Sequence, residues 1–195
     1  AFAVNEPHKI RTFTPTGFIG KMLLPKQALE NELQTMGFER WTILRPGSFM
    51  TNFLAPMVYM YSGLVDKGCW ITAWTTETKI PLVDPMDIGK LGAMALTDEK
   101  FHGKEIEIAG ELLTVEEILD QLRKATGRDL KAAYLTQEEI EVQAAVNPLI
   151  DAQLAMRDMA QFANLEKTNE WNLDLGTFER FLKREKEKVV RTFSV

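Results

Sequence analysis

The chain has 195 residues, enough to bury one sizeable hydrophobic core, and predicts one domain or slightly more. Its 45% of apolar and 26% of charged residues are ordinary for a globular protein. A net charge of −5 argues against nucleic acid as a partner, because no basic surface would attract a phosphate backbone. No run of about 18 apolar residues and no signal-peptide pattern occurs, so we expect neither a transmembrane helix nor a signal peptide.

Cys69 is the single cysteine of the sequence, which excludes an internal disulfide and favours a reducing, cytoplasmic location. Only His8 and His102 are available as a histidine base or ligand. Neither lies near Cys69 in the sequence, which disfavours a thiol enzyme. The three residues show no ligand spacing, and we expect no bound metal.

Residues 1–23 are expected to form a loop, because prolines and glycines interrupt them. Within this segment, residues 16–20 (TGFIG) have the glycine pair of a dinucleotide fingerprint, in which a helix N-terminus meets a pyrophosphate. The context differs, since Thr14 stands at the place of the first glycine and Pro25 should break the following helix after about one turn. We therefore expect no true fingerprint here.

A helix is expected from Pro25, whose missing N–H suits a first helical turn, to Gly37, a common C-terminal cap. The expected buried face recurs at helical spacing and consists of Leu29, Leu33 and Met36. Lys26 and Glu30 lie one turn apart, which is the spacing of an exposed ion pair worth roughly a few tenths of a kcal/mol.

Residues 41–53 (WTILRPGSFMTNF) are the most informative stretch of the chain. They begin as an apolar run typical of a buried parallel strand, which Pro46 ends because proline cannot donate to a sheet. Gly47 then permits a sharp turn or a close approach to a ligand. Ligands of doubly wound α/β folds bind at the carboxyl ends of strands, where residues 46–53 would lie. Two interpretations stay open: an ordinary turn with a hydrophobic segment, or a ligand-contacting loop.

The rest of the chain is predicted to alternate short strands with helices, and the aromatic residues of 56–64 suit either a core or a pocket wall. The expected strands are residues 69–74, 79–83, 105–109 and 130–135. The expected helix caps are Asp84, Thr114 with Glu117, and Thr136 with Glu139. A helical tail follows, with an amphipathic stretch at 149–162 and alternating charges at 183–188 that are typical of a solvated face.

Two further features have competing interpretations. Asp84 and Asp87 resemble a pair of catalytic carboxylates, but helix capping explains both, and we expect no acid–base role. Trp171 lies in a polar stretch, where it would either pack or line a pocket mouth or partner surface, and packing is the favoured interpretation.

Four motifs in register resemble the NmrA-like proteins, atypical members of the short-chain dehydrogenase/reductase superfamily. The motifs are residues 41–53, residues 78–84 with 87–89, residues 100–109, and residues 113–114 with 117–118. The resemblance covers roughly residues 24–140, and the fungal branch fits best. It implies an α/β fold in which a doubly wound, Rossmann-type parallel sheet precedes a smaller, mostly helical substrate domain.

The same resemblance implies a division of the chain. Residues 1–55 would hold the last helix and strand of the NAD(P)-binding domain, and residues 56–195 the substrate-binding domain. The front strands, the glycine fingerprint and the acidic ribose-binding residue find no convincing counterpart. We prefer a fragment, or an incompletely recorded sequence, to a lost half, because a loss would expose the edge and faces of the remaining sheet.

The resemblance also implies site residues. Lys26 matches the lysine that binds the nicotinamide ribose and assists proton transfer, so it is the candidate catalytic and cofactor-binding residue. The residues expected against the nicotinamide of NADP(H), or alternatively NAD(H), are Pro46, Gly47, Ser48 and Phe49. The residues expected to shape the substrate pocket are Met50, Asn52, Phe53 and Trp70. The tyrosine that should precede Lys26 by four residues is replaced by Met22.

Three functions stay open on this basis. The favoured one is an NAD(P)H-dependent reductase of a small hydrophobic or aromatic compound. The second is a non-catalytic NADP-binding redox sensor that acts through a protein partner, which the missing tyrosine favours. The third is an interaction fragment without a cofactor. A proton donor near the nicotinamide would indicate the reductase. Cofactor binding without turnover would indicate the sensor, and absence of cofactor binding would indicate the interaction fragment.

Overall fold

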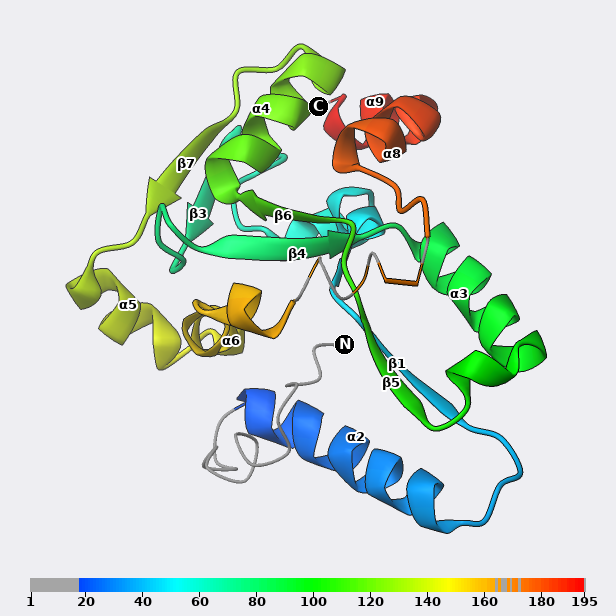
Figure 1. Cartoon of the computed structure of the whole chain (residues 1–195). Coiled ribbons are helices and arrows are strands. Elements are labelled where there is room, and N and C mark those ends of the chain that lie inside the picture. Colours follow the sequence, from blue (N-terminus) through cyan, green and yellow to red (C-terminus); the bar gives the residue numbers. More distant parts are fainter. Residues whose placement is uncertain (1–17, 164, 166–167, 169, 172, 195) are drawn as a thin grey trace.

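The computed structural model describes residues 18–163, 165, 168, 170–171 and 173–194, and these residues form a mixed α/β fold (Figure 1). No helix within these residues is both long enough and apolar enough to cross a membrane. The short 3-10 helices are η1 (Met50–Phe53), η2 (Met57–Met60), η3 (Glu99–Phe101) and η4 (Met159–Phe162).

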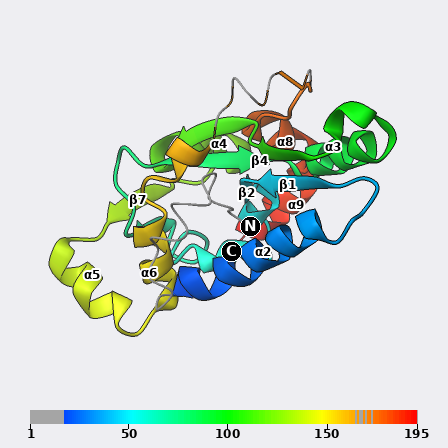
Figure 2. The same ribbon diagram turned by 60° about the horizontal axis from the view of Figure 1, so that its bottom comes forward.

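The strands β1 (Thr42–Pro46) and β5 (Lys104–Ile108) form a parallel pair. Alternate residues of β1 point to opposite faces of this pair, as the two-residue period of a strand requires. Arg45 reaches α2 (Phe18–Thr35) on one face, and Leu44 packs toward α3 (Pro85–Thr97) on the other. Helices therefore cover both faces, as expected for a doubly wound sheet (Figures 1 and 2).

A second set of strands lies beyond the end of β1. It contains β2 (Ser48–Phe49), β4 (Lys79–Val83) and β6 (Glu111–Thr114), with β2 parallel and β6 antiparallel to β4. A further parallel pair consists of β3 (Cys69–Thr72) and β7 (Lys131–Tyr134). The four strands expected from the sequence are thus confirmed to within two residues at each end. The strands β2 and β6 were not expected, because segments this short carry little periodicity.

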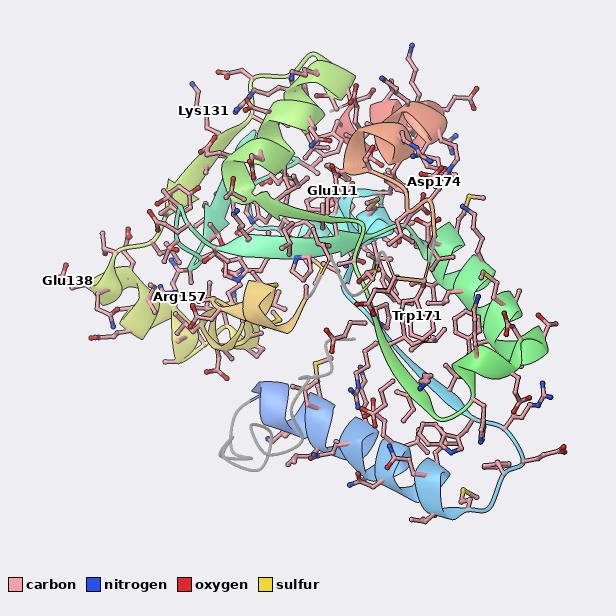
Figure 3. All side chains as sticks on the ribbon, in the orientation of Figure 1. Glu111, Lys131, Glu138, Arg157, Trp171 and Asp174 are labelled. Carbon is pink, nitrogen blue, oxygen red and sulfur yellow. The ribbon has the colours of Figure 1, made fainter. Side chains whose placement is uncertain are left out.

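The main hydrophobic core gathers side chains from β3, β4, the helix α4 (Val115–Thr126) and the C-terminal helices α8 (Phe178–Arg184) and α9 (Lys186–Phe193). A second core lies between β5 and α3. There Trp171 stacks on Phe101 with ring centroids 5.0 Å apart, and Figure 3 shows it beside β5. Packing, the interpretation favoured for this tryptophan, is what the structure shows.

The expected caps of α4 and α5 are confirmed. Thr114 and Glu117 form the capping box of α4, and Gly127 ends this helix with a left-handed φ of 71°. Thr136 and Glu139 form the capping box of α5 (Gln137–Ala144). Short polar side chains thus begin the helices where the sequence places them.

The helix α2 differs from the prediction. It begins at Phe18, inside the segment expected to be a loop, and Pro25 lies within it instead of at its start. The missing N–H of Pro25 leaves the Lys21 carbonyl without its helical donor, but Lys21 is exposed and water can hydrate this carbonyl. The expected buried face is also wrong, because Leu29 is 65% and Met36 59% exposed.

The amphipathic stretch at 149–162 is a helix that stops early. The helix α6 (Pro148–Ala155) covers only the first part of this stretch. Side chains in and just after α6 bind the C-terminal end of β3. Gln153 Oε1 accepts from the Thr72 hydroxyl at 3.0 Å and from the Ala73 N–H at 2.7 Å. Arg157 donates from Nε and Nη2 to the Ala73 carbonyl at 2.9 and 2.7 Å. These contacts fasten the helical region to the sheet.

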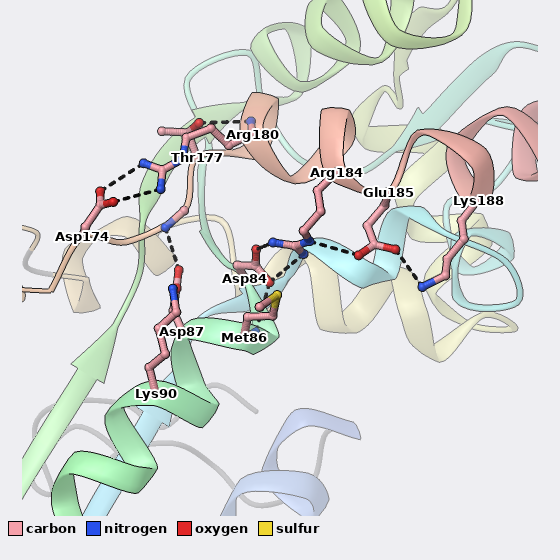
Figure 4. A network of polar contacts seen from close by, with 11 residues as sticks. Asp84, Met86, Asp87, Lys90, Asp174, Thr177, Arg180, Arg184, Glu185 and Lys188 are labelled. Atoms are coloured by element: carbon pink, nitrogen blue, oxygen red, sulfur yellow. Dashed lines mark hydrogen bonds and ion pairs between the residues drawn. The ribbon is translucent and has the colours of Figure 1, made fainter.

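A network of polar contacts joins the start of α3 to the C-terminal helices (Figure 4). The Asp84 carboxylate accepts from the Met86 N–H at 3.0 Å and caps α3 as expected. It also accepts from Arg184 Nη1 and Nη2 at 2.5 and 3.1 Å. Residues 183–188 are exposed apart from half-buried Glu185, as expected of a solvated face, but Arg184 also reaches back to the buried Asp84 carboxylate.

Asp87 has a comparable structural role. Its Oδ2 accepts from the Gly176 N–H at 2.6 Å, and its Oδ1 pairs with Lys90 at 2.8 Å. Gly176 suits this position because an added Cβ would lie 3.3 Å from oxygens of both Asp84 and Asp87. Capping and chain anchoring thus occupy both carboxylates.

The Asp84–Arg184 pair should make stability depend on pH. Burial alone would raise the pKa of the Asp84 carboxyl, but hydrogen bonds from Arg184 and Met86 outweigh it and hold this pKa below its ordinary value. The pair therefore contributes fully above pH ~4, where the unfolded carboxyl is ionised, and its contribution is lost as pH falls through the lowered pKa.

We expect Asp84→Asn to lower the free energy of unfolding by roughly 1–2 kcal/mol at pH 7, because asparagine keeps a capping acceptor but loses the charge. Urea unfolding at neutral and acidic pH measures this, and the loss should shrink in acid. Asp174→Asn is the control, since its pair with Arg180 is exposed. An equal loss for Asp84→Asn at both pH values would contradict the prediction.

Candidate functional site

The backbone at Gly47 passes between two strands at the carboxyl end of β1. Its N–H donates to the Ile108 carbonyl at 2.9 Å. An added Cβ would lie 2.5 Å from the Pro81 carbonyl oxygen, closer than real Cβ atoms come to any neighbour. The close approach that a glycine permits is therefore an approach to β4, and the Gly47 N–H is already used within the protein.

The next two residues form β2 and continue the chain into the second set of strands. Ser48 lies opposite Leu82 and Phe49 opposite Val83. Ser48 is buried, and half-buried Phe49 packs against the second core. The expected nicotinamide-contacting loop is thus a fixed segment at the carboxyl end of a parallel strand, which is where doubly wound folds bind ligands.

Tyr61 is a functional candidate that the sequence left among the aromatic residues of 56–64. Its hydroxyl makes side-chain hydrogen bonds with Ser48 and Asn52. Burial raises the pKa of Tyr61 by more than these hydrogen bonds lower it, so the phenol stays protonated. A buried tyrosine needs a partner for its hydroxyl, and Ser48 and Asn52 were the available polar side chains in the preceding loop.

The structure brings the expected substrate-pocket residues together around Tyr61. Its ring lies 4.8 Å from that of Phe53 and 4.7 Å from that of Trp70, measured between centroids. Met50 and Trp70 are completely buried and Phe53 nearly so, and all three belong to the main core. Asn52 is half-buried. A pocket role for these four residues stays a prediction, in which Asn52 is the member that reaches solvent.

Lys26 lies on α2 and is half-buried. Its expected partner, Glu30, is held by Arg45 of β1: Arg45 Nε and Nη2 donate to the two Glu30 oxygens at 3.3 and 2.7 Å. Among the described residues no carboxylate pairs with the Lys26 ammonium. The ion pair that the spacing suggested is therefore absent among the described residues.

The described residues include the segments expected to contact the nicotinamide and its ribose, which form one end of a dinucleotide. An ammonium on α2 that pairs with no described carboxylate and a fixed loop after β1 would suit a ribose and a flat ring. Of the fingerprint-like segment, Thr16 and Gly17 lie outside the described residues, and Gly20 is a helical residue of α2. Within the described residues, no group of three or more histidine, cysteine, aspartate or glutamate side chains could hold a metal ion.

A family model described as the NmrA-like family matches residues 17–191, which is most of the chain. The chain belongs to the NmrA-like family. Among curated relatives, agroclavine dehydrogenase of Claviceps purpurea is 29% identical over 140 residues, which cover 71% of this NmrA-like chain and 48% of the relative. Agroclavine dehydrogenase of Claviceps fusiformis is 29% identical over 109 residues, covering 55% and 37%. The chain thus spans less than half the length of these relatives.

Solved structures show the same fold. Leucoanthocyanidin reductase of Vitis vinifera, in a binary complex with NADPH, has a TM-score of 0.68 at 15% identity and covers 96% of this NmrA-like chain and 64% of its own. The NADPH-dependent quinone oxidoreductase QOR2 of Escherichia coli has a TM-score of 0.65 at 16% identity, covering 86% and 62%. At such identities the likeness supports the Rossmann-like fold alone.

The contact at Gly47 predicts a strong effect of a single methyl group. Gly47→Ala should lower the free energy of unfolding by roughly 1–3 kcal/mol, because its Cβ would displace the Pro81 carbonyl. Gly89→Ala is the matched control: nothing lies within 4 Å of an added Cβ, and alanine should stabilise α3 by about 0.5–1 kcal/mol. Urea unfolding midpoints measure both. Equal midpoints for the two variants would contradict the close approach.

The hydrogen bonds of Tyr61 predict a second effect. Tyr61→Phe should lower the free energy of unfolding by about 1 kcal/mol, because Ser48 and Asn52 lose their shared partner. Tyr59→Phe is the control, since Tyr59 is exposed and its hydroxyl can be hydrated. Thermal unfolding of both variants measures the difference. Loss of stability in the control alone would contradict the role of Tyr61.

Proposed function

We propose that this chain is part of an NAD(P)H-dependent reductase of a small hydrophobic or aromatic compound. The observation that carries the proposal is Lys26: Arg45 holds Glu30, and none of the described carboxylates pairs with the ammonium. Membership of the NmrA-like family supports it, as do relatives named as dehydrogenases and a neighbour solved with NADPH. For the same reason we propose NADP(H) as the cofactor, with NAD(H) as the alternative.

The proposed roles follow from the positions of the residues. Lys26 would donate hydrogen bonds to ribose hydroxyls and so orient the cofactor, which supplies a hydride when bound. Pro46, Gly47, Ser48 and Phe49 would provide a rigid wall against the nicotinamide, since their backbone is fixed by β4 and β5. Residues 1–55 would thus serve the cofactor and residues 56–195 the substrate.

The aromatic side chains behind this loop support an apolar substrate. Tyr61, whose hydroxyl interacts with Ser48 and Asn52, packs its ring against those of Phe53 and Trp70. Binding sites for small molecules are mostly apolar, with a few placed polar groups. We further propose a fungal-type relationship, supported by the Claviceps relatives, and a cytoplasmic location, supported by the single cysteine.

A redox sensor is the second candidate, and Met22 favours it. This residue lies on α2 one turn before Lys26 and is 45% exposed, so its side chain is available at the place where a proton-donating tyrosine would act. A thioether cannot donate a proton. A chain that binds NADP(H) without a donor would report the redox state to a protein partner instead of reducing a substrate.

The cofactor role of Lys26 has a direct test. Lys26→Ala should weaken NADPH binding about tenfold or more, because hydrogen bonds from a charged donor are lost, while the urea unfolding midpoint stays unchanged. Lys21→Ala, on an exposed position of the same helix, should bind like the unmodified chain. NADPH fluorescence titrations measure the dissociation constants. Unchanged affinity of Lys26→Ala would overturn the ribose-binding role.

The same titration separates the three functions. Binding together with NADPH oxidation in the presence of aromatic ketones or enones supports the reductase. Saturable binding with no oxidation across such a panel supports the sensor. Absence of binding to the unmodified chain would overturn both and leave the cofactor-free interaction fragment.

A further inference from the structure

Arg45 is a buried cation between two carboxylates. Its side chain is 7% exposed, and it pairs with Glu30 of α2 at 2.7 Å and with Glu105 of β5 at 2.6 Å. Gln34 Nε2, one turn beyond Glu30, donates to the other Glu105 oxygen at 2.7 Å. These four side chains join α2 to both strands of the β1–β5 pair. The cluster carries one positive and two negative charges.

Glu30 has a second cation within reach. Lys26 precedes it by four residues on α2, a spacing at which lysine and glutamate side chains are neighbours on the helix surface. Arg45 engages both Glu30 oxygens from one guanidinium, and such forked pairs are stronger and more directional than a pair with an ammonium. The lysine-first order is also the weaker orientation of this helical pair. Glu30 therefore pairs with Arg45 in preference to Lys26.

We propose that Arg45 is a positioning residue for the cofactor site: by holding Glu30 against β1, it keeps the Lys26 ammonium free of its neighbouring carboxylate. The inference rests on the proposed function, in which Lys26 binds the cofactor ribose. Arg45 thus acts through Glu30 on Lys26. Without Arg45, Glu30 and Glu105 become two unbalanced carboxylates on the same face of the β1–β5 pair. Lys26 is then the near cation that relieves their repulsion.

The first measurement is the reactivity of Lys26 and does not involve NADPH. Acetylation of lysines by an N-hydroxysuccinimide ester, followed by peptide mass spectrometry, compares the rate at each lysine. We expect Arg45→Met to slow acetylation of Lys26 about threefold, because a lysine in an ion pair is less available. Arg45→Met/Glu30→Gln should restore the rate, since the competing carboxylate is gone. Lys21 should react equally in all variants.

Arg45→Met alone strands buried charge and can fail to fold, so Glu30→Gln provides an independent test. This variant leaves Arg45 paired with Glu105 and should fold. If Arg45 holds Glu30 in the unmodified protein, Glu30→Gln leaves the Lys26 acetylation rate unchanged. A faster rate would mean that Glu30 already pairs with Lys26, and would overturn the inference. Lys90, which pairs with Asp87, serves as a paired lysine within the same sample.

The second measurement is NADPH affinity. Arg45→Met should raise the dissociation constant about threefold, and the double variant should return it to the value of the unmodified chain. A purely structural role predicts instead that the double variant binds no better than Arg45→Met, and that result would overturn the inference. If the unmodified chain binds no NADPH, the proposed function fails. The Lys26 acetylation rates still decide whether Arg45 controls Glu30.

Discussion

The passage of the chain at Gly47 is the constraint on which the two halves of the described fold depend. At this residue the backbone leaves β1 and enters β2, so it must hydrogen-bond to β5 and pass the Pro81 carbonyl of β4 at once. A side chain of any size would hold β4 away from this crossing. Because the crossing lies at the carboxyl end of β1, the same constraint that joins the strands also forms the candidate ligand-binding edge.

Buried ion pairs then fix the helices onto this frame. Arg45 joins α2 to β1 and β5, and Arg184 joins α8 to the start of α3 through Asp84. Each arginine is balanced by a carboxylate that also serves another contact. Removing the carboxylates around Arg45, or removing Arg184 from Asp84, would leave a buried charge, which destabilises far more than the pair itself contributes. The pairs therefore act mainly by penalising other placements of α2 and α8, and so specify the arrangement.

The sequence predicted the fold where local signals and tertiary contacts agree. Thr114 with Glu117, Thr136 with Glu139, and Asp84 are caps because their side chains bond the next helical N–H groups, which needs no distant partner. The prediction was wrong for α2, where Pro25 is tolerated inside the helix at an exposed position. It also missed Arg184, whose partner lies 100 residues away. Contacts between residues so far apart in the sequence form only in the folded chain, so no periodic pattern in the sequence predicts them.

The candidate site was likewise predicted from the sequence only in part. The motif in residues 41–53 predicted the place of the loop, but most of its side chains are used by the fold: Arg45 by Glu30 and Glu105, and Ser48 by Tyr61. The sequence did not single out Tyr61, because an aromatic residue in an apolar segment is equally typical of a hydrophobic core and of a pocket wall. A polar group already bonded within the protein has little left to offer a ligand. Lys26 differs, because its carboxylate neighbour Glu30 is engaged by Arg45 and no described carboxylate pairs with its ammonium.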